Sequence, residues 1–374
     1  MRLGRTIGLF VLAVVGAALV WLGAGSLRAA QRERAAEAAW AGSFGPLGDL
    51  PAKFPAHPTN DAAHAIEESA QNLGIELRPR GEQGPEDETS RPKKTEWGAV
   101  RAALEGWVDA QAAKPEGLPA APLPLVAAYL AAHAPALDAI EKTLLAGPAP
   151  DWATDLGKLH AAPVPNVSGQ MQLVRVLVGR AEARAAAKNA RADESLRAAF
   201  ALTGALRGRP EIASQLVSIA ATRLELAAVR RIPVDAVAWR ERLKTLDPRG
   251  AMLATWKREA WVNHEAAKGL RAASLRDGPL SGRVAALAGA WRERVESAAS
   301  LEAWKTTIDA AAKTPVADTD PRLLGEAFQQ ALARDRVGPS PAIKNLADSW
   351  RRANVLALEI RKTDEELAAR ASKP

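Results

Sequence analysis

The chain has 374 residues, of which 48% are hydrophobic and 25% charged, proportions typical of a folded protein rather than a disordered one. It carries 50 Lys and Arg against 43 Asp and Glu, a net charge of +7, with both signs interspersed. Nucleic-acid binding is not expected, because no basic stripe with interleaved aromatic residues stands out. The absence of cysteine excludes disulfides, thiolate nucleophiles and Cys-ligated metal sites.

The first element is an apolar segment close to the N-terminus. Thr6 to Gly25 contains no charged residue, and a helix of that length crosses a hydrocarbon core of about 30 Å. Trp21 lies near its distal end, where an aromatic ring suits the headgroup level of a bilayer. We therefore predict a transmembrane anchor with a juxtamembrane helical stalk over residues 1–43. A cleaved signal peptide is the alternative.

The orientation of the anchor depends on the basic residues around it. Arg2 and Arg5 precede the apolar segment, whereas Arg28, Arg32 and Arg34 follow it, so the positive-inside rule favours neither side. The short head before the segment need not be translocated, which favours a body outside the cytoplasm. We expect a single-pass protein of the bacterial inner (cytoplasmic) membrane with a periplasmic body.

Residues 44–94 are predicted to be a linker. The first part, from 44 to 59, is rich in Pro and Gly, and a short helix is expected at about 60–73. Residues 78–94 have almost no apolar side chain and are expected to form a polar loop. A helical body should then occupy residues 95–374.

The body consists of one helical pattern after another, with no period-2 alternation bounded by hairpin turns. Helices are expected at 96–111, 123–133, 135–145, 171–188, 193–206, 210–230, 233–246, 249–270, 280–299, 301–313, 321–333 and 342–371. No period of 33 to 45 residues establishes a regular repeat. The prediction is an all-α fold, either an irregular multi-helix bundle or an α-solenoid-like array of helical hairpins, preceded by one transmembrane helix.

The stretch from Gly208 to Val229 is long and apolar enough to suggest a second membrane span. A helix in contact with lipid would not tolerate Glu211, Arg223 and Glu225 without partners. A helical wheel divides the stretch into an apolar arc (Ile212, Leu216, Ile219, Ala220, Leu226 and Ala227) and an opposite polar side (Glu211, Ser214, Gln215, Ser218, Thr222 and Glu225). We predict a packed core helix whose polar side is its wetter edge.

Arg223 is the first candidate site residue, because it falls within that apolar arc. An unpaired charge there would be costly, so the side chain should reach water or meet a carboxylate. A structural ion pair is the first interpretation, and a guanidinium that faces a ligand is the second.

The tryptophans supply the other candidates. The chain has 11 Trp against 1 Tyr and 5 Phe, and Trp256 and Trp261 lie in its C-terminal half. Trp on amphipathic helices commonly fills space between Ala-rich neighbours. The alternative is that Trp256 and Trp261 form an aromatic platform for sugars or peptides.

No motif for catalysis, cofactor binding or metal binding appears. The 5 histidines are scattered, and no pair has the i, i+4 spacing of a helical zinc site. The sequence also lacks a nucleophile elbow, a phosphate-binding loop and a dinucleotide fingerprint. We therefore name no catalytic, cofactor or metal residue.

Three stretches carry a resemblance: NDAAHAIEESAQ at 60–71, RPEIASQLVSIA at 209–220 and RRANVLALEIRK at 351–362. Through them the chain resembles a family of uncharacterised, Ala- and Leu-rich, all-helical bacterial envelope proteins with a single N-terminal membrane anchor. The resemblance implies the helical fold and the anchor, and it brings no activity.

Together these features predict a membrane-anchored helical scaffold or interaction protein of the bacterial cell envelope. Its partners would be the membrane, through the N-terminal helix, and another envelope protein. Two alternatives stay open. One is a binding module for peptidoglycan fragments or another small ligand in a Trp-lined cleft, and the other is a hydrolase whose acids converge without a sequence motif.

Overall fold

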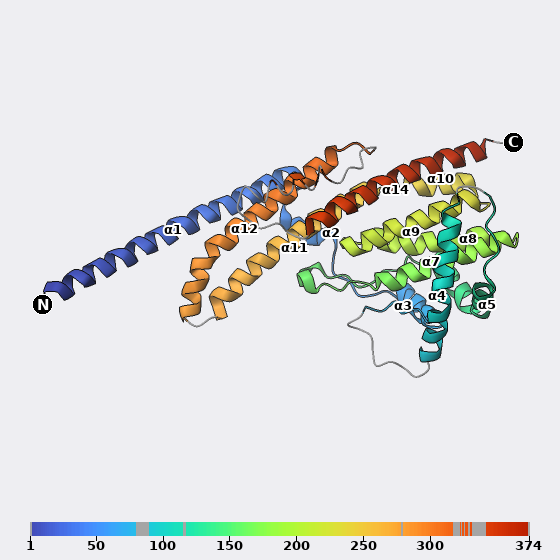
Figure 1. Ribbon diagram of the computed structural model, residues 1–374, viewed down its shortest axis with the longest axis horizontal. Coiled ribbons are helices and arrows are strands. Elements are labelled where there is room, and N and C mark those ends of the chain that lie inside the picture. Colours follow the sequence, from blue (N-terminus) through green and yellow to red (C-terminus); the bar gives the residue numbers. More distant parts are fainter. Residues whose placement is uncertain are drawn as a thin grey trace. The chain divides into compact units, whose positions relative to one another are not determined.

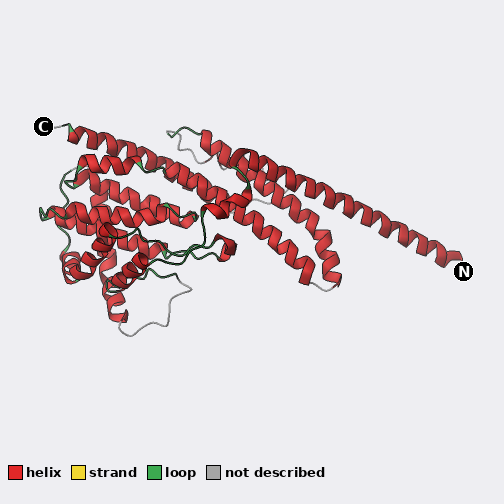
Figure 2. Ribbon diagram, turned by 180° about the vertical axis from the view of Figure 1, so that it is seen from behind, coloured by secondary structure: helices red, strands yellow, loops and turns green. Residues whose placement is uncertain are grey.

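The computed structural model describes residues 2–79, 90–114, 117–277, 280–316 and 342–372, with single positions between 322 and 330. Within these residues no strand is present, and one isolated antiparallel bridge joins His57 to Thr154. Helices joined by loops account for the rest (Figure 2). The prediction of an all-α fold is confirmed.

Most helices begin and end within a few residues of the predicted positions. In chain order (Figure 1) they are α1 (Arg2–Phe44), η1 (Leu47–Asp49), α2 (Leu50–Lys53), α3 (Asp61–Gln71), α4 (Ser90–Ala112), α5 (Pro124–Ala132), α6 (Ala134–Ala146), η3 (Leu156–Ala161), α7 (Val167–Ala186), α8 (Ala192–Arg207), α9 (Ile212–Arg231), α10 (Ala236–Lys244), α11 (Pro248–Asp277), α12 (Leu280–Lys313) and α14 (Ala342–Ala371).

Local differences from the predicted elements have physical causes. The two helices predicted at 280–299 and 301–313 are one helix, α12, because no Gly or Pro interrupts the chain between them. α4 begins at Ser90, inside the predicted polar loop, and its first turn lies so close to Gly74 that a Cβ there would be 2.2 Å from the Lys93 carbonyl oxygen. Residues 80–89 and most of the predicted helix at 321–333 lie outside the described residues.

The chain divides into two compact units, each assembled from separate segments. The first, which we name the α1 unit, comprises residues 1–53, 256–313 and 321–347. The second, the α9 unit, comprises residues 54–255, 314–320 and 348–374. Residues 256–313 thus belong with α1 and not with the remainder of the predicted body.

In the α1 unit, α12 runs parallel to α1 and α11 runs antiparallel to it. Trp21 contacts Trp291 and Arg32 binds Glu302, and both pairs are separated by the same number of residues in the chain. Among the α1 side chains that the structure describes, the buried ones are Ala29, Glu33, Ala36 and Trp40, whose spacing forms one stripe along the helix. This stripe is the part of α1 that its neighbours cover.

In the α9 unit, α7, α8 and α9 pack against one another and form the centre of the core. α6 packs on α8 and α3 packs on α6, while α4 contacts α7 and α9. α9 is therefore in contact with more than one neighbour, which fits the prediction that this stretch is a core helix.

Ile212–Arg231 is also the one helix, among the described residues, that is long and apolar enough to cross a membrane, and 61% of its most apolar window is buried inside the protein. The predicted span at Thr6–Gly25 lies within α1, but most of its side chains are outside the described residues. The N-terminal membrane anchor thus remains a prediction.

Candidate functional site

The orientation of α9 departs most from the sequence prediction. Its polar side faces inward: Ser214, Gln215, Ser218, Thr222 and Glu225 are each 3% exposed or less. Its predicted core residues Leu216 and Ala220 are only half-buried. The prediction that the polar side of α9 is its wetter edge is therefore wrong, because neighbouring helices supply polar partners for this side.

The end of α8 is the first of these partners. The Gln215 side-chain amide donates hydrogen bonds to the carbonyl oxygens of Leu206, Arg207 and Arg209, at 3.3, 3.0 and 2.6 Å. The last carbonyl groups of a helix have no amide partner within the helix, so Gln215 supplies a donor to the Arg207 carbonyl, while the Leu206 carbonyl also accepts from the Arg209 amide at 3.1 Å. This residue closes the α8–α9 connection.

Further along α9, a carboxylate and a guanidinium lie between α8 and α9. Glu225 is fully buried and accepts a hydrogen bond from the Thr203 hydroxyl, while its second oxygen lies 3.9 Å from Arg207 Nη1 without a hydrogen bond. Burial raises the pKa of Glu225, although Arg207 and Thr203 act in the opposite direction. Burial also lowers the pKa of the Arg207 guanidinium, which Glu225 opposes.

A cavity of about 290 Å³ opens beside this pair, and we name it the α9 cavity. Its polar lining residues are Arg207, Gln215, Ser218, Thr222, Thr245 and Asp247, and its apolar lining includes Ile219, Leu246, Pro248, Ala251 and Leu356. Arg207 donates to the Thr222 hydroxyl at 3.3 Å. Hydroxyl groups, one guanidinium and one carboxylate around a small volume can bind a small polar molecule.

The acidic member of the cavity also has a structural task. Asp247 accepts a hydrogen bond from the Gly250 amide at 2.8 Å and thereby caps the start of α11. A side chain at Gly250 would collide with this carboxylate, because a Cβ there would lie 2.1 Å from it. The position of the carboxylate in the cavity wall is thus held by the backbone of the next helix.

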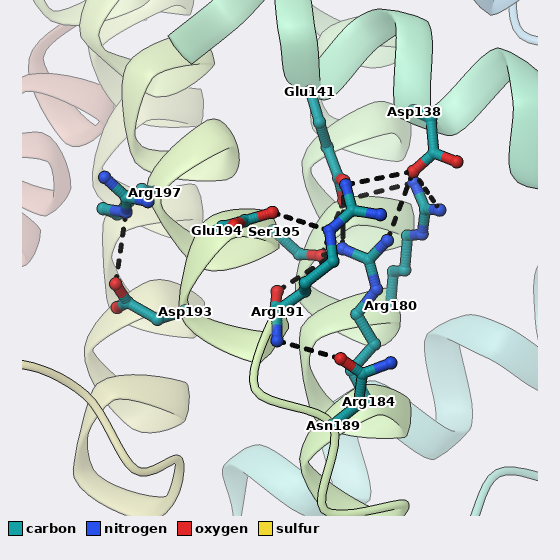
Figure 3. A network of polar contacts seen from close by, with 10 residues as sticks. All are labelled: Asp138, Glu141, Arg180, Arg184, Asn189, Arg191, Asp193, Glu194, Ser195 and Arg197. Carbon is teal, nitrogen blue, oxygen red and sulfur yellow. Dashed lines mark hydrogen bonds and ion pairs between the residues drawn. The ribbon is translucent and has the colours of Figure 1, made fainter.

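A second polar cluster joins α6, α7 and α8 (Figure 3). Glu141 is buried and accepts from Arg184 at 2.9 Å and from the Ser195 hydroxyl at 2.6 Å, while Arg180 lies 3.2 Å away. Asp138 at its edge contacts Arg180 at 2.8 Å. Each guanidinium in the cluster faces a carboxylate, so it holds three helices together and does not offer an open site for an anion.

The electrostatics of this cluster agree with a structural role. Burial alone would raise the pKa of Asp138, but Arg180, Arg191 and Arg184 lower it below its ordinary value. The carboxylate stays ionised near neutral pH and remains an acceptor for the surrounding guanidinium groups.

Arg223 does not occupy an apolar environment. Its side chain is 50% exposed and makes a bidentate contact with Glu359 of α14, with Nε at 3.0 Å and Nη2 at 2.9 Å from the carboxylate. The placement predicted for Arg223 is wrong because its side chain is half exposed beside α14, but the predicted carboxylate partner is present. Arg223 does not line the α9 cavity.

Trp256 and Trp261, the candidate aromatic platform, are 0% and 6% exposed. Both belong to α11 and to the α1 unit. Their rings are part of its packed interior, as are those of Trp40 and Trp304. No face of either candidate ring lies open to a sugar or peptide.

One Ser–His–Glu arrangement invites comparison with a hydrolase. His264 Nδ1 lies 2.8 Å from the Ser297 hydroxyl, and its Nε2 lies 2.9 Å from Glu37. In a serine hydrolase triad the nucleophile pairs with Nε2 and the acid with Nδ1, the reverse of this order. Ser297 and His264 are buried and line neither the α9 cavity nor the groove described below. The three residues join α11, α12 and α1 as a polar contact between helices.

Comparison of the chain with protein-family models, with curated proteins and with solved structures finds no match. The resemblance drawn from the sequence motifs therefore stays a prediction.

Sequence reasoning missed the residues of the α9 cavity, although a signal for them exists. The cavity residues Gln215, Ser218 and Thr222, together with Glu225 beside the cavity, have alternating spacings of three and four residues, which place them on one narrow stripe of α9. A narrow polar stripe on a helix that is apolar over most of its remaining surface can indicate a buried polar site as well as a wet edge.

Proposed function

We propose that the chain is a single-pass, membrane-anchored interaction protein of the bacterial envelope, with its helical units outside the cytoplasm. The observation that carries the proposal is the exposure of apolar side chains at the end of the apolar segment of α1. Val20, Trp21 and Leu27 are 74%, 67% and 61% exposed, whereas Ala29 and Glu33 further along the helix are 2% and 8% exposed.

The length of α1 supports this proposal. A continuous helix of 43 residues is about 65 Å long, enough to cross a hydrocarbon core of about 30 Å and still run beside α12. In both views the N-terminal turns of α1 extend beyond the hairpin formed by α11 and α12 (Figures 1 and 2). A bilayer would cover the apolar surface that the protein leaves uncovered.

Insertion is tested by reconstituting the full-length protein into vesicles and extracting them at alkaline pH. We expect the protein to stay with the lipid pellet, and a Leu12→Arg/Val15→Arg variant to be released, because charges within a span are costly. The matched control is Arg34→Gln, which changes a charge beyond the apolar segment and should not cause release. Release of the unmodified protein would refute the anchor.

The absence of cysteine makes the orientation directly measurable. Ser372 is exposed near the end of α14, so a Ser372→Cys variant carries one accessible thiol. Labelling by a membrane-impermeant maleimide in spheroplasts before lysis is the result expected for a periplasmic body. Labelling only after lysis would place the body in the cytoplasm.

The α9 cavity favours a second function, the binding of a small polar molecule. Arg207 could pair with a carboxylate and Asp247 with an ammonium group, and the Ser218 and Thr222 hydroxyls offer further hydrogen bonds. An amino acid or a short peptide fragment of peptidoglycan has this chemistry. The buried tryptophans take no part in this version of the binding hypothesis.

Isothermal titration calorimetry with short cell-wall peptides tests the second function. We expect binding that a Ser218→Ala/Thr222→Val variant weakens, because hydrogen-bonding groups of the wall are removed while its shape is kept. Arg223→Gln is the matched control, since Arg223 lies on the same helix outside the cavity. Equal binding by the two variants, or none by the unmodified protein, would refute a ligand in this cavity.

A further inference from the structure

A groove lies between α1 and α12 where the apolar segment of α1 ends. Its volume is about 310 Å³, and we name it the α1–α12 groove. It is lined by Trp21, Gly25, Arg28 and Arg32 of α1 and by Trp291 and Val295 of α12. The groove is open at Gly25, where a Cβ atom would meet nothing within 4 Å.

The groove has an aromatic part and a basic part. The Trp21 and Trp291 rings meet edge to face, with centroids 6.1 Å apart. Arg28 follows Trp21 by two turns of α1, about 10 Å along the axis. Arg28 and the two rings line the same groove.

The two arginines of the groove differ in their partners. Arg32 binds Glu302 at 2.8 Å. Arg28 is exposed and, among the described residues, forms neither a hydrogen bond nor an ion pair. The groove therefore presents one uncompensated cation beside an aromatic floor, a combination complementary to an anion that carries an apolar tail.

We propose that the α1–α12 groove binds an anionic phospholipid, with the phosphate at Arg28 and an acyl chain against Trp21 and Trp291. The proposal rests on the membrane anchor proposed above, because only an inserted α1 brings the groove to the level of the headgroups. The lipid proposal goes further than the membrane anchor, because it assigns a class of lipid and a residue that binds it.

The sequence of α12 independently supports a groove at the level of the lipid headgroups. Val284 to Trp291 carries no charge, and this run is bounded by Arg283 on one side and by Arg292, Glu293 and Arg294 on the other. Since α12 runs parallel to α1, the tryptophan of each helix lies at the same end of an uncharged stretch, and an arginine follows it. Aromatic residues followed by basic residues are the pattern expected where a helix leaves the hydrocarbon core and meets anionic headgroups.

The test uses full-length protein in nanodiscs of phosphatidylcholine containing phosphatidylglycerol, followed by detergent release and native mass spectrometry of the retained lipids. We expect preferential retention of phosphatidylglycerol, and a loss of about fivefold in its affinity in Arg28→Gln. Arg34→Gln is the matched control, because it removes the same charge from an exposed position of α1 outside the groove. It should retain phosphatidylglycerol like the unmodified protein.

Several results would overturn the proposal. Equal retention of phosphatidylcholine and phosphatidylglycerol would show that the headgroup charge is not recognised. An equal loss in Arg34→Gln would indicate general attraction to a basic helix. Displacement of the lipid by millimolar inorganic phosphate would identify a site for soluble phosphate. Failure to enter nanodiscs of either composition would instead refute the anchor itself, so the two proposals fail in distinguishable ways.

Discussion

α1 and α9 depart from the usual distribution of polar and apolar side chains in opposite directions. α9 turns Gln215, Thr222 and Glu225 into the core, whereas α1 leaves Val20 and Trp21 exposed. In α9 the polar groups meet the end of α8 and a guanidinium, so their burial is compensated. In α1 Trp21 stays largely exposed, although its ring contacts that of Trp291 on α12. The surroundings of a helix, and not its composition alone, decide which face is buried.

The largest expected effect concerns the buried ion pair between α7 and the end of α9. Glu182 and Arg231 are in direct contact, and both side chains are 1% exposed. Glu182→Ala should lower the free energy of unfolding by about 3–5 kcal/mol, because it leaves the Arg231 charge buried without its partner. Urea unfolding at pH 8, monitored by circular dichroism, measures this loss.

The exposed pair Arg223–Glu359 is the matched comparison for that variant. Glu359→Ala should cost about 1 kcal/mol or less, since water screens a half-exposed pair. Losses of similar size in the two variants would show that the Glu182–Arg231 pair is open to water in solution.

The pH dependence of stability should also reveal the buried carboxylates. Burial raises the pKa of Glu182 from its ordinary value of 4.5 to about 7, with Arg231 opposing the shift. A carboxyl group with a raised pKa in the folded state binds its proton more tightly there than in the unfolded chain. Its contribution to stability is complete below pH 4.5 and is lost as the pH rises to about 7.

Urea midpoints measured between pH 4.5 and pH 8 check this sign. The free energy of unfolding should fall over this interval by on the order of 1–3 kcal/mol. Glu225 has a raised pKa as well, so Glu225→Gln should flatten the curve in part. A free energy of unfolding that rises with pH over this interval in the unmodified protein would contradict the raised pKa values of Glu182 and Glu225.

The inward polar face of α9 is tested by two neighbouring substitutions. Gln215→Leu should lower the free energy of unfolding by about 1–3 kcal/mol, because the carbonyl groups of Arg207 and Arg209 lose their side-chain donor. Leu216→Gln changes a half-buried side chain and should cost less. The helical wheel predicts the opposite order, so thermal unfolding of the two variants distinguishes the two orientations directly.

The sequence predicted the positions of the helices well, but it did not predict which segments each helix packs against. The reason is physical. Helix ends depend on local chemistry, such as the Asn60 side chain that accepts from the Ala63 amide at the start of α3. Periodicity shows which residues share a face, but not what that face meets. The contact of Arg32 with Glu302 and that of Arg223 with Glu359 join segments that are distant in the chain, so they could not be read from local patterns.

The smallest effect is expected on the exposed side of α1. Leu27 is 61% exposed, so Leu27→Gln should change the unfolding free energy of the detergent-solubilised protein by less than about 0.5 kcal/mol. Ala36 lies on the same helix but is 4% exposed, and Ala36→Gln should cost about 1–3 kcal/mol, because the larger polar side chain has no room or partner in the stripe covered by neighbouring helices. Thermal unfolding in detergent compares the two. A loss of similar size for Leu27→Gln would mean that a protein surface, and not lipid or water, covers this side of α1, which would remove the main support for the anchor.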